Sequence, residues 1–390
     1  MKQKVAVIDP LGSHGSSHHF YLFGQISGLS NNDINISLYT NNKTDNPFIQ
    51  GVKFYDFYKD IFSSRFKILS GFRWLIGTIR SIFHAKLSGV TVFHFHVFET
   101  NLFTLFNVIL ARILLGKVTL TIHDVYSFSN PRSPGSSASQ RRASIMITLI
   151  YALTDLILTH NKFSKMEISK SNSNIISRIH IVPHGNYTPF ITIQKDKEKS
   201  REHLDLPTKK TILLFFGMIK KVKGLEVLLK ALRKVVDTNP DTVLLIAGKP
   251  WKNNFKFYQQ IIAENDLSEN IILHTKFIAD KEVAYYYSAS DLVILPYKKI
   301  YQSGVLMMTW SYERPALASD LPPFKEVIKD NENGFLFSSE DVDDLASRLN
   351  QILSNKDNLE KVRVNGNRLI NKRFGWDEIG RLTKEAYQTL

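Results

Sequence analysis

The chain contains no cysteine. This absence excludes a disulfide framework, a thiolate metal site and a cysteine nucleophile. The chain also lacks a long apolar run: its most apolar stretch, residues 102–115, is short and carries Asn107 and Arg112, so we interpret it as a buried core helix. The short run Val5–Ile8 leads directly into a glycine-rich loop, which is not the pattern of a signal peptide. We therefore expect a cytoplasmic protein with two or three domains in its 390 residues.

Acidic residues are scarce relative to basic ones, and the formal net charge is +14. The excess is uneven, because residues 1–194 hold 19 Lys and Arg against 9 Asp and Glu, whereas the remainder holds 31 against 27. Either the charge serves only solubility, or the first half of the chain faces an anionic partner such as lipid, nucleic acid or a phosphorylated substrate.

Much of this charge lies in residues 58–86. Between residues 53 and 86, seven Lys and Arg and only two acids are interleaved with Phe, Trp, Leu and Ile. The pattern fits two structures equally: an amphipathic face that lies on the anionic inner face of the cell membrane, or a basic surface helix that covers a sheet. No recognition motif for nucleic acid accompanies the charge, so we expect no nucleic-acid partner.

Strand and helix patterns alternate along the chain. Short, continuously apolar segments such as residues 117–124 and 211–217 predict parallel strands covered on both faces. A charged stretch, residues 193–210, interrupts the alternation and is predicted to be a linker. We therefore predict an α/β fold with two Rossmann-like, doubly wound domains, residues 1–192 and 205–375. Ligands bind outside the carboxyl ends of such sheets, so we expect the site in a cleft across which the two domains face each other.

Two loops of the second domain have features of an anion site. A strand ends at Gly217, and the loop that follows carries Lys220 and Lys223 and leads into a helix, so backbone N–H groups, the helix dipole and ammonium groups suit a phosphate. A second loop, Gln302–Gly304, leads into another helix and suits an anion for the same reason. Each loop alone also fits an ordinary turn, with the serine only capping its helix. Together they predict a diphosphate site.

A third loop of this domain holds Phe277 and Ile278 after a predicted strand. It fits either a site for a nucleotide base or a plain connection between strand and helix. The segment Asp341–Asp343 resembles the Asp-x-Asp motif of metal-dependent sugar transferases, but it begins a helix, where acids favour the helix dipole. We predict that it caps the helix and binds no metal.

In the first domain, His123 and Asp124 follow a strand end. His123 fits a contact to a sugar hydroxyl or a role in proton transfer, and equally fits a structural role in its loop. His94 and His96 share one face of a strand. With no third ligand nearby in sequence, they are more often packed or cleft-lining than metal-bound, so we expect no metal site.

The second domain resembles the retaining glycosyltransferases of family 4, which have the GT-B fold. The segments that carry the resemblance stand in family order: residues 215–232, 289–297, 303–328, 333–337 and 373–379. The resemblance implies a nucleotide diphosphate sugar in the second domain and a saccharide acceptor, expected to be lipid-linked, in the first. It implies no metal or other cofactor, because protein charge and helix N-termini stabilise the leaving diphosphate. It also implies that the closing helix, residues 376–390, returns to the first domain.

The sequence and the resemblance together select candidate residues for each role. Those expected to bind the donor are Gly217, Lys220, Lys223, Phe277, Ile278, Tyr301, Gln302, Ser303, Gly304, Val305 and Glu326. Those expected on the acceptor side are Gly12, Ser13, His14, Gly15 and His96. The expected catalytic residues are His123, which matches the family's histidine near the transferred sugar, and Asp124.

The chain departs from the family pattern at two places. Met218 stands where the family usually has arginine, so Lys220 is expected to supply the charge. Ile300 and Met308 occupy the positions of the usual Glu-x7-Glu pair, so neighbouring side chains must supply those contacts. Two alternatives follow: an inverting enzyme of the same fold, with Asp124 or Glu99 as base, or an inactive member that acts as a binding partner in polysaccharide assembly.

Overall fold

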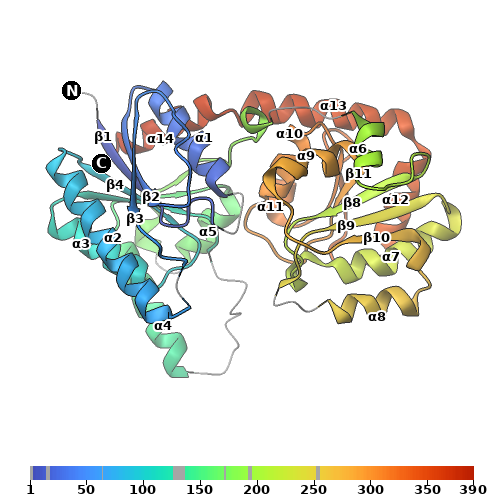
Figure 1. Cartoon of the computed structure of the whole chain (residues 1–390), viewed down its shortest axis with the longest axis horizontal. Coiled ribbons are helices and arrows are strands. Elements are labelled where there is room, and N and C mark those ends of the chain that lie inside the picture. Colours follow the sequence, from blue (N-terminus) through green and yellow to red (C-terminus); the bar gives the residue numbers. More distant parts are fainter. Residues whose placement is uncertain are drawn as a thin grey trace. The chain divides into compact units, whose positions relative to one another are not determined.

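The computed structural model describes residues 3–14, 18–63, 65–125, 137–170, 173–191, 196–251 and 255–390. The chain forms two compact units. Unit 1 comprises Met1–Gly185 together with Phe374–Leu390, and unit 2 comprises Asn186–Arg373 (Figure 1). The chain therefore leaves unit 1 at Gly185 and returns to it for its last helix.

Unit 1 is built on a sheet of seven parallel strands in the order β3-β2-β1-β4-β5-β6-β7. The strands are β1 (Lys4–Ile8), β2 (Asn35–Asn41), β3 (Val52–Tyr58), β4 (Val92–Val97), β5 (Lys117–Ile122), β6 (Leu156–Thr159) and β7 (Ile179–Ile181). The helices are α1 (His18–Asn31), α2 (Lys67–Leu87), α3 (Leu102–Ile113), α4 (Ser137–Leu153), α5 (Lys162–Ser169) and α14 (Trp376–Tyr387). The central strands are buried along nearly their whole length, as expected for a parallel sheet with helices on both faces.

Three expectations for unit 1 need correction. Residues 52–58 form strand β3, and the helix predicted from residue 58 begins only at Lys67. Alternation of Val, Phe and Tyr with polar residues indicates this strand. The basic residues in the same stretch instead favoured the interpretation as an amphipathic helix. Residues 127–142, rich in Ser, Pro, Gly and Arg, favour a loop in the sequence, but α4 begins within them at Ser137. Helix α3 is buried on one face only, because Leu102 and Ile113 are exposed. No helix in the described part of the chain is long and apolar enough to cross a membrane.

The C-terminal helix α14 lies against α1 within unit 1, as Figure 1 shows for the red and blue helices. Glycines allow this close approach. A Cβ on Gly28 would lie 2.0 Å from the carbonyl oxygen of Trp376, and one on Gly380 would lie 2.1 Å from the carbonyl oxygen of Gly28. The Trp376 ring fills the space above Gly24 and Gly185. The last helix is therefore part of the unit 1 core.

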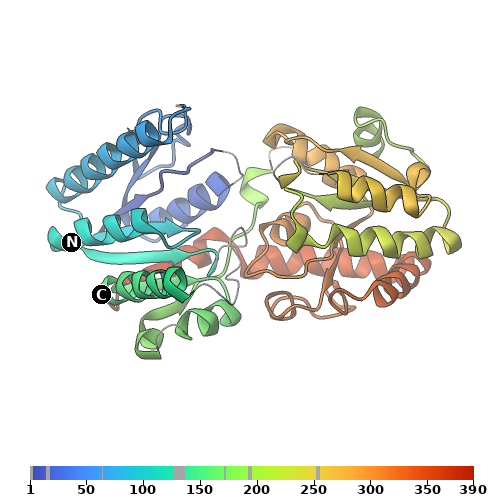
Figure 2. The same ribbon diagram turned by 90° about the horizontal axis from the view of Figure 1, so that it is seen from below.

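Unit 2 is built on a parallel sheet of six strands in the order β10-β9-β8-β11-β12-β13. The strands are β8 (Thr211–Phe216), β9 (Thr242–Ala247), β10 (Ile271–His274), β11 (Leu292–Leu295), β12 (Ala316–Ser319) and β13 (Phe335–Phe337). The helices are α6 (Lys197–His203), α7 (Leu225–Thr238), α8 (Lys256–Glu264), α9 (Asp280–Ala289), α10 (Gly304–Ser311), α11 (Pro322–Lys325), α12 (Val342–Ser354) and α13 (Lys356–Arg373). Helices lie on both faces of this sheet (Figure 2).

The stretch 193–210, predicted as a linker, is not an extended connection. It contains α6, whose Arg201 is buried and donates to the Ala289 carbonyl and to the Asp291 carboxylate. At least this charged residue therefore holds α6 against the rest of unit 2. The predicted capping role of Asp341 is confirmed, because its carboxylate accepts hydrogen bonds from the N–H groups of Asp343 and Asp344 at the start of α12.

The strand order marks one ligand-binding position in each unit. In unit 1 the order of strands reverses between β1 and β4, and in unit 2 it reverses between β8 and β11. Loops at the carboxyl ends of two such strands turn to opposite faces of the sheet and leave a crevice, where ligands of doubly wound folds bind. Most of the candidate residues lie near these two positions; Phe277, Ile278 and Glu326 lie elsewhere in unit 2.

Candidate active site

The loops that follow β8 and β11 are held together at the reversal point of unit 2. The N–H of Lys298 donates to the Val222 carbonyl over 2.8 Å, and the Lys298 ammonium pairs with Glu226 at 2.5 Å. Gly224, at φ 64°, passes so close to β11 that a Cβ would lie 1.9 Å from the Pro296 carbonyl oxygen. The two predicted anion loops are therefore neighbours in one place.

Lys223 supplies a cation there. Its ammonium lies over the Tyr297 ring, 5.3 Å from the ring centre, and 3.4 Å from the Phe216 carbonyl oxygen. Burial, together with the charge of Lys220, lowers the pKa of Lys223 to about 7. Among the described residues no carboxylate pairs with this ammonium. A half-buried cation without a carboxylate partner favours the binding of an anion.

The N-terminus of α10 lies beside this lysine. A Cβ on Gly217, whose φ is 95°, would lie 2.9 Å from the Lys223 ammonium nitrogen and 3.7 Å from Cγ2 of Val305. Ser303 caps the helix by accepting the N–H of Leu306 over 3.1 Å. The N–H groups of the first turn have no acceptor within the helix, and they carry the positive end of its dipole. The side-chain oxygen of Gln302 is buried and has no hydrogen-bond partner in the described chain.

The remaining donor candidates are more dispersed. Lys220 lies over the Trp251 ring, 4.8 Å from its centre, so it is partly engaged within unit 2. Phe277 is exposed and Ile278 half-buried in the loop after the edge strand β10. Tyr301 is buried beside the α10 loop, and Glu326 is exposed at the end of α11.

Buried apolar residues occupy the two positions where the family usually has glutamate. Ile300 and Met308 are both buried among core residues of unit 2. Neither side chain can accept a hydrogen bond from a sugar or ribose hydroxyl. This end of the sheet therefore offers an ammonium group, a helix N-terminus and the Gln302 amide rather than carboxylates.

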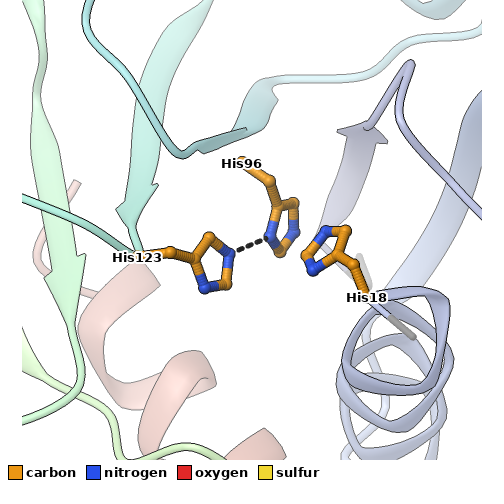
Figure 3. Close-up of side chains that lie close together, drawn as sticks. All are labelled: His18, His96 and His123. Carbon is orange, nitrogen blue, oxygen red and sulfur yellow. Dashed lines mark hydrogen bonds between the residues drawn. The ribbon is translucent and has the colours of Figure 1, made fainter. Parts of the chain in front are cut away.

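A chain of histidines lies at the reversal point of unit 1. His160 donates from Nδ1 to the Val182 carbonyl, because a carbonyl oxygen only accepts. Its Nε2 therefore accepts from Nδ1 of His123, and Nε2 of His123 accepts from Nδ1 of His96, each over 3.0 Å. Figure 3 shows the last of these contacts. One backbone carbonyl thus fixes the tautomer of three rings.

Burial keeps these rings neutral. It lowers the pKa of His96 and His123 well below the ordinary value, with a smaller effect from neighbouring histidine charges, and it lowers the pKa of His160 to about 4. A neutral imidazole accepts at one nitrogen and donates at the other. This series of hydrogen-bonded histidines ends at Nε2 of His96, which is buried without a hydrogen-bond partner among the described residues.

His18 joins this cluster from the start of α1. Its Nε2 lies 2.5 Å from Oδ2 of Asp9, and the other carboxylate oxygen of Asp9 accepts the N–H groups of Leu11 and Gly12. Burial alone would raise the pKa of Asp9, but His18 and the other hydrogen bonds outweigh it and lower the pKa to about 2. The sequence reasoning missed His18, His160 and Asp9. The signal available was a polar residue directly after each strand or before a helix.

The predicted acceptor loop is packed on its own unit. Gly12, at φ 50°, lies so close to Thr44 that a Cβ would clash with its hydroxyl, and the N–H of Ser13 donates to that hydroxyl. His14 stacks on Phe62 with ring centres 3.7 Å apart. Gly15 lies outside the described residues. Asp124 is half-buried next to His123, whereas Glu99 is exposed after β4.

Comparison with protein families bears on the site in unit 2. Residues 196–369 match the family model described as glycosyl transferases group 1. Unit 2 is therefore similar to this family along most of its length. The matched stretch includes the loops after β8 and β11, and hence Lys223 and the start of α10.

Curated relatives of the group 1 domain match over parts of their length. Spore coat protein SA of Bacillus subtilis is 24% identical over 207 residues, which are 50% of this chain and 53% of that protein. A D-inositol 3-phosphate glycosyltransferase of Xylanimonas cellulosilytica is 23% identical over 68% of this chain and 65% of its own. A GDP-mannose:glycolipid 4-beta-D-mannosyltransferase of Xanthomonas campestris is 32% identical over 35% of each. The chain thus spans between about a third and two thirds of these relatives.

Solved structures extend the likeness to the whole chain. HepE of Anabaena in complex with UDP and glucose superposes with a TM-score of 0.76 at 16% identity, over 100% of both chains. Sucrose-phosphate synthase of Thermosynechococcus elongatus gives a TM-score of 0.74 at 16% identity, over 99% of this chain and 98% of that one. The fold is therefore GT-B, and the stretch that matches the group 1 family lies in its second unit.

Proposed function

We propose that the protein is a glycosyltransferase that moves a hexose from a nucleotide diphosphate sugar to a saccharide acceptor. The observation that carries the proposal is the Lys223 ammonium, which is half-buried beside the N-terminus of α10, has no carboxylate partner in the described part of the chain and lies in the stretch that matches the group 1 family. The UDP bound to HepE, which has the same fold, is consistent with this assignment.

The chemistry follows from the charges at this position. Transfer breaks the bond between the sugar and the diphosphate, and negative charge develops on the leaving diphosphate. The ammonium of Lys223 and the N–H groups of the first turn of α10 stabilise that charge. We propose that they do so without a metal ion. From the resemblance to family 4 we also propose that the configuration of the sugar is retained, with His123 contacting the transferred sugar.

We propose that the acceptor is lipid-linked, in surface polysaccharide or glycolipid biosynthesis, and that unit 1 binds the inner face of the cell membrane. Helices α2, α3 and α4 lie side by side in unit 1 (blue, cyan and green in Figure 2), and Trp74 of α2 contacts Phe103 of α3. Their exposed apolar side chains, with Phe66 just before α2, are Phe66, Ile68, Leu69, Phe72, Ile76, Ile79, Phe83, Leu87, Leu102, Phe103, Ile109, Ile113, Ile145 and Leu149. Arg65, Lys67 and Arg80 are exposed among them. An apolar face with basic residues suits anionic lipid.

The donor site is tested by nucleotide binding in the presence of EDTA. Thermal unfolding is measured with UDP, GDP and ADP for the wild type, for Lys223→Met and for Lys221→Met. Lys221 is an exposed lysine of the same turn and serves as the matched control. A ligand at about 100 times its dissociation constant adds about 2.7 kcal/mol to the stability of the folded state.

We expect one nucleotide to stabilise the wild type and Lys221→Met but not Lys223→Met, and the responsive nucleotide names the donor for turnover assays. Stabilisation by none of them in folded protein would refute the donor site and favour the inactive binding-partner alternative. If the protein binds a nucleotide but turns over no corresponding sugar nucleotide, the donor site stands and only the enzymatic activity is refuted.

A further inference from the structure

Three imidazoles converge in unit 1 from three different elements. His18 begins α1, His96 lies on β4, and His123 follows β5. One ring nitrogen of each lies within 4.8 Å of those of the other two. The ring centres are 5.1 Å apart for His18 and His123, 5.3 Å for His96 and His123, and 5.6 Å for His18 and His96. Figure 3 shows the three rings close together, with the His96 ring between the other two in this view.

Hydrogen bonds orient two of these rings. Nε2 of His18 lies 2.5 Å from Oδ2 of Asp9, so a metal ion would bind this ring through Nδ1. The Val182 carbonyl, acting through His160, places the proton of His123 on Nδ1 and its lone pair on Nε2. Histidines that bind metal ions typically donate their other N–H to a carboxylate, a carbonyl or a similar partner, which fixes the tautomer. Asp9 and His160 occupy these outer positions.

His96 completes the set. Its Nδ1 lies 3.0 Å from Nε2 of His123, and its own Nε2 is buried without a hydrogen-bond partner among the described residues. Two nitrogens bound to one tetrahedral zinc ion at about 2.0–2.1 Å are separated by roughly 3.3 Å. A metal ion bound to Nε2 of His123 takes the place of the proton that Nδ1 of His96 donates to it. His96 then binds the ion through Nδ1 and carries its proton on Nε2.

We propose that His18, His96 and His123 form a binding site for a transition-metal ion of the Zn²⁺ class, with Asp9 and His160 as its outer partners. Three neutral nitrogen ligands suit Zn²⁺ or Co²⁺ and leave a fourth position for water or another ligand, whereas Mg²⁺ requires oxygen ligands. Metal binding does not depend on the proposed function. Its consequence does: an ion on His123 competes with the role of that residue at the sugar, so it inhibits transfer.

The test is metal binding by the full chain, with any affinity tag removed and the protein stripped with EDTA. Zn²⁺ binding is measured by calorimetry, and Co²⁺ binding by the visible absorption of tetrahedral cobalt. Four variants are compared: His18→Ala, His96→Gln, Asp9→Asn and His180→Gln. His180, on β7 and outside the cluster, is the control histidine of the same unit. Mg²⁺ is the control ion.

We expect one equivalent of Zn²⁺ or Co²⁺ for the wild type and His180→Gln, no tetrahedral cobalt spectrum for His18→Ala and His96→Gln, and affinity about 10- to 100-fold weaker for Asp9→Asn. Absence of stoichiometric binding to folded wild-type protein overturns the proposal, even if a histidine variant fails to fold. Binding that survives in both His18→Ala and His96→Gln, or is lost in His180→Gln, places the ion elsewhere and also overturns it. None of these measurements involves a nucleotide, so failure here leaves the donor site intact.

Discussion

The ammonium group of Lys223 lies over the ring of Tyr297, 5.3 Å from its centre, in a position where burial lowers its pKa to about 7. In the free protein this lysine is therefore mostly neutral at pH 8. A diphosphate binds the ammonium form, so binding takes up a proton and weakens by about tenfold for each pH unit above 7, until the raised pKa of the complex is reached. Calorimetry between pH 7 and 9 in buffers of different ionisation enthalpy measures both effects. In Lys223→Arg, which stays charged, the pH dependence should vanish; a pH-independent wild type would contradict the assignment.

The same lysine should oppose folding of the free protein. Its pKa in the unfolded chain is the ordinary value near 10.5, so between about pH 7 and 10.5 the unfolded state binds more protons, and stability rises with pH across that window. Lys223→Met removes the buried cation. We expect it to raise the free energy of unfolding in urea, and to do so more at pH 6 than at pH 9, while abolishing nucleotide binding. Equal effects at both pH values would mean that the ammonium is not desolvated.

Ser303 allows its capping role to be separated from its place at an anion site. Ser303→Ala loses the hydrogen bond to the Leu306 N–H and should cost about 1 kcal/mol of stability. Ser303→Asp keeps a good N-cap but places a negative charge at the start of α10. We expect Ser303→Asp to unfold like the wild type in urea and to bind nucleotide more weakly than Ser303→Ala. If Ser303→Asp binds nucleotide normally, the start of α10 does not face the diphosphate.

The contact between α1 and α14 should be sensitive to a single methyl group. Gly28→Ala places a Cβ 2.0 Å from the backbone oxygen of Trp376, which can yield only if the helices separate. We expect a loss of about 1–3 kcal/mol in urea unfolding. Gly71→Ala, on α2 with no atom within 4 Å of the added Cβ, is the matched control and should gain roughly 0.5–1 kcal/mol from helix propensity. Equal stabilities for the two variants would show that α14 does not need this approach.

The exposed face of α2 and α3 should govern membrane binding. Replacing Ile68 and Phe72 by serine removes apolar contact, and replacing Lys67 and Arg80 by glutamine removes about 1 kcal/mol of attraction per charge to an anionic surface. Sedimentation with anionic and neutral vesicles at low and high salt measures the two contributions. Phe257→Ser, an exposed aromatic of unit 2, is the control and should bind like the wild type. Wild-type protein that sediments with no vesicle would exclude this role.

The position of the candidate donor loops could be predicted from the sequence, because each loop follows a strand whose end is recognisable. Apolar strands ending at Gly217 and Pro296 indicated where the carboxyl edge of a parallel sheet would be, and the structure brings Gly217, Lys223 and Val305 together there. The capping role of Asp341 was predictable for a similar reason, because its hydrogen bonds are local. The surroundings of Ile300 and Met308 were not, since their burial depends on how α10 packs.

The histidine cluster was not predictable, because its members meet only through the strand order. His96 and His123 become neighbours when β4 pairs with β5, and His18 reaches them through the helix that follows β1. The sequence placed His94 and His96 on one face of a strand, and their rings do stack, with centres 5.1 Å apart. The hydrogen bonds of His94, however, go to Tyr387 of α14 and Thr121 of β5, which the sequence did not indicate. Periodicity shows which face of a strand a residue occupies, and it does not show which strand lies next to it.

The return of the chain to unit 1 has a consequence for its synthesis. Unit 2 is continuous in sequence, whereas unit 1 needs α14, where the Asp377 carbonyl accepts a hydrogen bond from Asn32, 345 positions earlier. As the ribosome proceeds along the message, unit 1 therefore waits for a helix that is made after unit 2. Unit 2 can close while the apolar surface of α1 is still uncovered. A nascent chain stalled before Trp376 should thus expose that surface to chaperones.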